Sequence, residues 1–176
     1  MAAFVALLRG IAPTNPKMRG AELKKVFESL ACDHVRTVIA SGNVLFESPE
    51  RSVRRLEDRI EAALEDHLGA PCSTIVWTRR KIGDLAKSDV FDRFDDSPTD
   101  RCNVTFQKRP AKGVATPDVG AGAEIVAVRD GVVFSVIDST AAKTPDLMRK
   151  IEQAYGKQTT TRTWKTIHRI DKAFDA

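Results

Sequence analysis

The first 77 residues alternate between strand and helix patterns in an order that few folds share. Apolar or β-branched runs and stretches with apolar residues at helical spacing follow one another as strand, helix, strand, strand, helix, strand. This order is the split βαβ plan of ferredoxin-like domains. The sequence therefore predicts an α+β chain whose N-terminal subdomain, residues 1–77, is ferredoxin-like (βαββαβ).

Local signals predict where these elements begin and end. The apolar run at 3–8 has the length of a buried strand. Ser48-Pro49 predicts the start of the second helix, because serine caps helices and proline suits the first helical position. Gly69 predicts the end of that helix, and a strand follows at 72–77.

The patterns in residues 78–176 predict a second mixed α/β subdomain, which we expect to pack against the first. The clearest signal is a hairpin over 124–138, whose two-residue turn is Asp130-Gly131. The other elements expected here are a helix at 80–87, a strand at 103–107 and helices at 145–155 and 164–174. A Pro/Gly loop spans 109–123, and "GKQTTTRT" separates the two last helices.

Composition narrows the class of protein. The chain has 176 residues, 42% of them hydrophobic, and a net charge of +4, which is ordinary globular usage with a mild basic excess. It has three cysteines at wide spacing, no apolar run long enough to cross a membrane and no signal peptide pattern. We therefore expect a cytoplasmic protein without a membrane segment, and nucleic acid gains little support as a partner.

No stretch carries the signature of a known reaction or metal site. The sequence has no H-E-x-x-H, no G-x-S-x-G and no glycine-rich phosphate loop. The aspartates between 89 and 100 lack the spacing of a calcium loop, and "SGNVLFES" fails the aromatic and basic pattern of an RNA-binding strand. Catalytic residues and cofactors stay unassigned, no metal is expected, and enzymatic activity is left undecided.

Three polar stretches lie at the ends of predicted elements. Arg9-Gly10 follows the first strand, Ser41-Gly42-Asn43 forms the hairpin turn, and Thr161, Arg162 and Trp164 lie at the predicted start of the last helix. A helix start offers free N–H groups, so hydroxyls and an arginine there suit an anion. The alternative is a capped helix, with Thr161 or Thr163 as the cap, Arg162 in solvent and Trp164 in the core.

The stretches "FVALLRGI", "VRTVIASGNVLF" and "TTTRTWKTI" together resemble motifs of the bacterial family called domain of unknown function 1697. The resemblance implies an α+β protein of two subdomains and no particular activity. It carries motif positions onto Arg9, Gly10, Ser41, Gly42, Asn43, Thr160, Thr161, Arg162 and Trp164. Polar residues at strand ends, a turn and a helix start are what a shared ligand cleft needs.

This chain departs from the family pattern at several positions. Ala12-Pro13-Thr14 stands where the family usually has a glycine pair, so no flexible phosphate-cradling loop is expected there. Thr163 and Lys165 replace two asparagines of the third motif, and Ala40 replaces a polar residue before the Ser-Gly-Asn turn. If the family shares one activity, these departures imply that part of it is altered in this chain.

Three hypotheses of function follow. The first is a protein that binds a small anionic or phosphate-bearing ligand between the subdomains through Arg9, Gly10, Ser41, Gly42, Asn43, Thr161, Arg162 and Trp164. The second is a nucleic-acid-binding module. The third is a structural or homo-oligomeric protein without catalysis, whose motif residues only stabilise packing. The sequence leaves the oligomeric state open.

Overall fold

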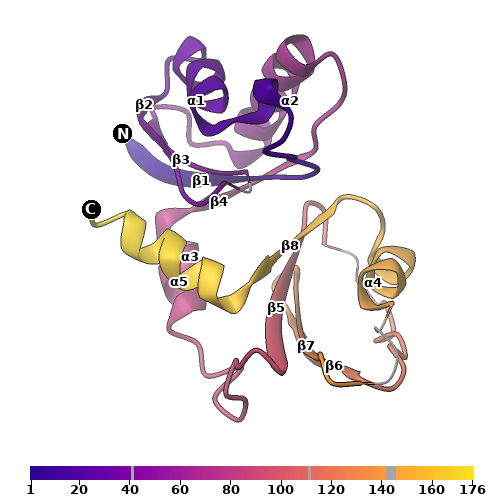
Figure 1. The fold of residues 1–176 in the computed structure, drawn as a ribbon. Coiled ribbons are helices and arrows are strands. Elements are labelled where there is room, and N and C mark those ends of the chain that lie inside the picture. The colour runs from indigo at the N-terminus through magenta and orange to yellow at the C-terminus, as the bar shows by residue number, and fades with distance from the viewer. Residues whose placement is uncertain (41, 111, 142–145) are drawn as a thin grey trace. The chain divides into compact units, whose positions relative to one another are not determined.

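The computed structural model describes residues 1–40, 42–110, 112–141 and 146–176 (Figure 1). By their internal contacts the residues form two compact units, Met1–Ala86 with His168–Ala176, and Lys87–Ile167. Each unit contains a four-stranded antiparallel sheet with helices, which confirms the predicted α+β class. Whether residues 1–77 and 78–176 are separate folding domains stays a prediction.

The first unit follows the predicted order of elements. Its sheet has the strand order β2-β3-β1-β4, and each neighbouring pair is antiparallel, as in a ferredoxin-like domain. The elements are β1 (Ala2–Leu8), the 3-10 helix η1 (Pro16–Met18), α1 (Gly20–Ser29), β2 (Asp33–Thr37), β3 (Asn43–Ser48), α2 (Val53–Leu68), β4 (Thr74–Thr78) and α3 (Arg79–Ala86).

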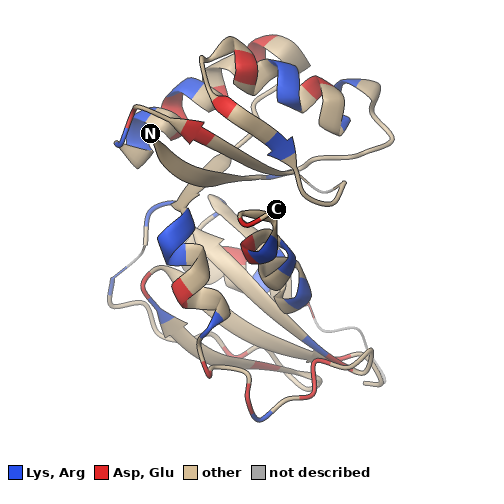
Figure 2. Ribbon diagram, turned by 90° about the vertical axis from the view of Figure 1, so that its left-hand side faces the viewer, with Lys and Arg blue, Asp and Glu red and all other residues tan. Residues whose placement is uncertain are grey.

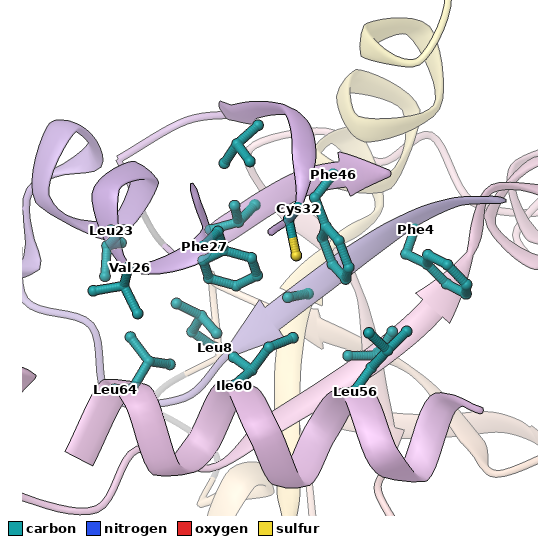
Figure 3. Packing of buried hydrophobic residues seen from close by; sticks show 14 of the residues in the cluster. Phe4, Leu8, Leu23, Val26, Phe27, Cys32, Phe46, Leu56, Ile60 and Leu64 are labelled. Carbon is teal, nitrogen blue, oxygen red and sulfur yellow. The ribbon is translucent and has the colours of Figure 1, made fainter. Parts of the chain in front are cut away.

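The core of this unit lies between the sheet and the helices α1 and α2 (Figure 3). Leu56, Ile60 and Leu64 recur every four residues and form the buried face of α2. Aromatic rings from β1, α1 and β3 fill the centre, with Phe46 5.6 Å from Phe4 and 5.3 Å from Phe27 between ring centroids. The periodicity that predicted these elements is therefore the periodicity of one packed core.

Two glutamates of α2 complete the hydrogen bonding of strand β4, which lies at one end of the sheet. The carboxylate of Glu57 accepts the backbone N–H of Val76 at 3.1 Å, and that of Glu61 accepts the N–H of Thr74 at 2.7 Å. Glu57 is only 2% exposed. Because a buried N–H without a partner is costly, these carboxylates fix α2 against the sheet.

The start of α2 differs from the prediction. Ser52, not Ser48, is the N-cap, and its hydroxyl accepts the N–H of Arg55 at 3.4 Å. Ser48 is instead the last residue of β3, buried and paired with Ala2. Strand β3 is longer than its apolar pattern indicated and includes Ser48, so the helix begins later and Ser52 caps it. Gly69 ends the helix in the left-handed region, with φ of 75°, as predicted.

We expect Glu57→Ala to lower the free energy of unfolding by about 1–3 kcal/mol, since it leaves the N–H of Val76 buried without this acceptor. Asp58→Ala, at the exposed neighbouring position of the same helix, is the matched control and should change stability by less than about 0.5 kcal/mol. Urea unfolding of both variants measures the difference. Equal stabilities would show that the glutamate does not support the strand.

The second unit repeats the strand order of the first. Its sheet has the order β6-β7-β5-β8, so the strands taken in chain order occupy the same positions as β1 to β4. The described part of 108–122 forms no helix, although α1 occupies the equivalent connection in the first unit. The elements are β5 (Asp100–Gln107), β6 (Ala123–Arg129), β7 (Val132–Asp138), α4 (Leu147–Tyr155), β8 (Thr159–Thr163) and the start of α5 (Trp164–Ala173), whose residues from His168 onward belong to the first unit.

The hairpin predicted in this unit is confirmed. Asp130 and Gly131 both have positive φ, 50° and 78°, as a two-residue turn between twisted strands needs. The strand β8 was not predicted: Thr159–Thr163 was interpreted as a loop leading to a helix start, and that interpretation is wrong. Four threonines among its five residues fit a strand, and β5 supplies the pairing partner.

Candidate functional site

Arg9 lies directly after β1, where its backbone is held on both sides. Its N–H donates to the carbonyl of Ser73 at 2.9 Å, and its carbonyl accepts the thiol of Cys72 at 3.4 Å. Burial raises the pKa of the Cys72 thiol to about 11, so the thiol stays protonated and can donate at neutral pH. The backbone of Arg9 is therefore fixed, while its side chain is half-buried.

Gly42 joins the Ser-Gly-Asn turn to the end of β1. Its carbonyl accepts the N–H of Leu8 at 2.8 Å, next to Arg9 and Gly10 in the chain. Its φ is +76°, and a Cβ there would come within 2.6 Å of the Ile11 side chain. Only glycine fits both requirements without strain. The structure thus brings the first two predicted stretches together; Ser41, which belongs to the second, lies outside the described residues.

Asn43 closes the hairpin turn with its side chain. Its Nδ2 donates to the carbonyl of Val38 at 2.9 Å, and the N–H of Val38 donates to the Asn43 carbonyl at 2.9 Å. The residue is fully buried, in the first position of β3. These contacts give the Asn43 amide a role in holding the turn, whatever else it touches.

We expect Asn43→Asp to destabilise the protein by about 1–3 kcal/mol, because a carboxylate at this buried position cannot donate to the Val38 carbonyl. Asn15→Asp is the matched control. The Oδ1 of Asn15 accepts the N–H of Lys17 at 3.0 Å, and an aspartate keeps that acceptor. Thermal unfolding of the two variants tests the difference; a loss of stability at both positions, or at neither, would contradict it.

Thr161 and Arg162 lie in strand β8 of the second unit, so they do not form a helix start. The hydroxyl of Thr161 is 2.8 Å from that of Thr105 on β5, and it donates to the sulfur of Met148 on α4 at 3.2 Å. The hydroxyl of Thr163 accepts the N–H of Thr166 at 3.3 Å and caps α5. Thr163 is thus the cap, one of the two that the capped-helix alternative named.

Arg162 is buried in the second unit, with 9% of its surface exposed, so the capped-helix alternative was wrong to place it in solvent. Its Nη1 donates to the hydroxyl of Thr160 at 2.8 Å and to the carbonyl of Thr161 at 2.9 Å. Burial lowers the pKa of the guanidinium to about 10, since removal from water disfavours the charged form. The group is still protonated at neutral pH, so the strand carries a buried positive charge.

Trp164 is the first residue of α5 and is 9% exposed. Its ring meets that of Phe91 edge to face, with 5.2 Å between the centroids, and Phe91 meets Phe134 of β7 in the same way at 5.8 Å. Such pairs stabilise a core beyond their buried area. Trp164 therefore packs in an aromatic cluster of the second unit, as the capped-helix alternative held.

Two threonines beside the candidate residues were not among them: Thr160, which the family resemblance gave only as a motif position, and Thr105. Both are buried, and each holds a predicted site residue by a hydroxyl contact. Thr160 and Arg162 are two residues apart, so they share a face only if the segment is a strand. Recognising β8 would have revealed this pair. In the described part of the chain, no three His, Cys, Asp or Glu side chains gather to hold a metal.

A ferredoxin-like first sheet, a second sheet of the same strand order and motif residues at their strand ends define an α+β protein of two units. Residues 1–134 match the family described as "Protein of unknown function (DUF1697)", and the chain belongs to this family. The match contains the first two motif stretches, whereas the stretch with Arg162 lies beyond it.

A solved structure shares the whole fold. The conserved bacterial protein SP0830 from Streptococcus pneumoniae superimposes with a TM-score of 0.73 at 18% identity, covering 100% of this chain and 99% of that one. At this identity the likeness shows the fold alone. No curated protein matches the sequence. No helix among the residues described is long and apolar enough to span a membrane.

Proposed function

We propose that this chain is a cytoplasmic protein that binds a small anionic or phosphate-bearing ligand, with Arg162 as the principal anchor. The observation that carries the proposal is the burial of its guanidinium in a strand of threonines. Arginine recognises carboxylates and phosphates through paired N–H donors. The three cysteines are buried free thiols, which suits a reducing compartment.

The energetics of Arg162 support an anionic partner. Taking a guanidinium out of water costs several kcal/mol in general, and neutral acceptors recover only part of that cost. Two of its hydrogen bonds, both from Nη1, go to the Thr160 hydroxyl and the Thr161 carbonyl. A bound anion would add charge-assisted hydrogen bonds, which are stronger than bonds to neutral acceptors.

Arg9 is a second candidate cation, considered within the first unit alone. It ends the central strand of the first sheet, and its backbone is fixed by Ser73 and Cys72. A fixed backbone limits the positions that its half-buried side chain can take, which lowers the entropy lost when a ligand binds. Gly10 and Gly42 are the proposed neighbours of Arg9 in the first unit, and Thr161 is the proposed neighbour of Arg162 in the second.

The surface charges give the nucleic-acid alternative no comparable support. Figure 2 shows Lys and Arg interspersed with Asp and Glu along α1 and α2 of the first unit. The chain has 28 basic and 24 acidic residues, so attraction to a polyanion is partly cancelled. A compact anion that needs one or two arginines is the better fit to this distribution.

A thermal-shift screen tests the proposal, with inorganic phosphate, glucose 6-phosphate and adenosine 5′-monophosphate as probes. A probe at about 100 times its dissociation constant should stabilise the protein by about 2.7 kcal/mol. For a chain of this length that raises Tm by roughly 5–10 °C. We expect Arg162→Gln to abolish the shift for the probe that binds.

Two further variants make the outcome decisive. Arg101→Gln removes an exposed arginine of β5 and should keep the full shift. Arg162→Lys keeps the charge without the paired donors, so it should keep the fold and lose most of the shift, which covers the case in which the glutamine variant does not fold. A full shift in both Arg162 variants, or no shift with any probe, would refute the proposal.

A further inference from the structure

A cavity of about 220 Å³ lies in the first unit, beside the connection between β2 and β3. Its wall comes from the loop before α1, the first residues of α1 and the end of the hairpin. The residues that matter for its chemistry are Met18, Arg19, Leu23, Thr37, Ile39 and Ala40. All of them belong to the first unit, so this unit alone forms the cavity.

Most of this wall is hydrocarbon. Leu23 is buried at the floor of the cavity, and Met18 and Ala40 add apolar surface. Ile39 is 39% exposed and has φ of +59°, a conformation that is strained for a β-branched residue. Strained residues of this kind gather at ligand clamps, and an occupant of the cavity would cover the exposed side chain. The cavity therefore suits an apolar body.

One side of the wall is positive. Arg19 is exposed at the N-cap of α1, and no side chain caps this helix end. The first acidic residue of the helix, Glu22, is already paired with Lys25 at 2.6 Å. Arg19 and the start of α1 both line the cavity, so a negative group at this end would be favoured by the partial positive charge of the helix start and by a nearby arginine.

Gly20 determines how closely the start of α1 approaches Thr37 at the end of β2. A Cβ on Gly20 would lie 2.7 Å from the hydroxyl oxygen of Thr37, so the helix start meets the end of β2 as closely as glycine allows. The Thr37 hydroxyl therefore stands beside the helix start, on the same wall as Arg19. A carboxylate at this end of the cavity could accept hydrogen bonds from Arg19 and from the Thr37 hydroxyl.

We propose that the cavity binds a small free monocarboxylate with an apolar ring or branched chain. Pockets for drug-sized ligands span about 300–1,000 Å³, so a cavity below that range takes a smaller molecule, of roughly seven to ten non-hydrogen atoms. The carboxylate lies at Arg19 and the start of α1, and the apolar body lies against Leu23, Ile39 and Ala40. This site is separate from Arg162 and does not rest on the function proposed above.

The test is an NMR titration of the ¹⁵N-labelled full chain with three probes at matched ionic strength. Sodium benzoate has the charge and the apolar ring, benzamide has the ring alone, and inorganic phosphate has only the charge. We expect benzoate to give saturable shifts at the amides of Gly20 and Leu23, two residues of the cavity that lie outside the anion site proposed above. Benzamide should bind at least about tenfold more weakly, since it lacks the charge-assisted contacts.

Three variants locate the site. Arg19→Gln should weaken benzoate binding about three- to tenfold, as expected for one exposed cation. Ala40→Leu should abolish it by filling the cavity, and its position is exposed, so the fold is kept. Arg54→Gln, an exposed arginine of α2 outside the cavity, should leave binding unchanged.

Any of the following results would overturn the inference. Absence of saturable benzoate shifts, equal binding of benzamide, or the same shifts with phosphate would contradict the ligand class. Unchanged binding in Ala40→Leu would contradict the location. Arg162→Lys should leave the benzoate shifts of the first unit intact, so a failure of the anion proposal at Arg162 and a failure here give different results.

Discussion

The central position of β1 is the constraint on which the first unit depends. The strand pairs with β3 on one side and β4 on the other, and residues on both of its faces are buried: Phe4 and Leu8 towards α1 and α2, Val5 and Leu7 on the opposite face. A strand in this position has no polar face, which explains the unbroken apolar run. Its end fixes Arg9 and places it beside the Ser-Gly-Asn turn.

The fold of the first unit could be predicted almost completely because its signals are local. The apolar spacing of its helices, the glycine that ends α2 and the turn between β2 and β3 each depend on residues close together in the sequence. The second unit was harder. A threonine-rich strand such as β8 lacks the apolar alternation that identifies a strand, and only its pairing with β5 makes it one. The repeated strand order is not visible in the pattern of elements, because a loop stands in place of the first helix.

The candidate site could be predicted only as a set of positions. The sequence predicted Asn43, Arg162 and Trp164 as residues of one site, but their contacts differ in kind. Asn43 closes a turn and Trp164 packs against Phe91. Arg162 is a buried charge. Polar type and position do not distinguish a residue that holds its own backbone from one that faces a ligand. The cavity beside Ile39 was invisible in the sequence, because a left-handed isoleucine leaves no pattern.

The two carboxylates that α2 presents to β4 have a consequence for association. A strand at the end of a sheet normally offers its outward N–H groups to any extended chain, the first step towards strand addition and fibrils. On β4 those groups at Thr74 and Val76 are already taken by Glu61 and Glu57. At the other end of the sheet, the register of β2 shifts between Asp33 and Arg36. Neither margin is a regular template, so this sheet resists growth by a fifth strand.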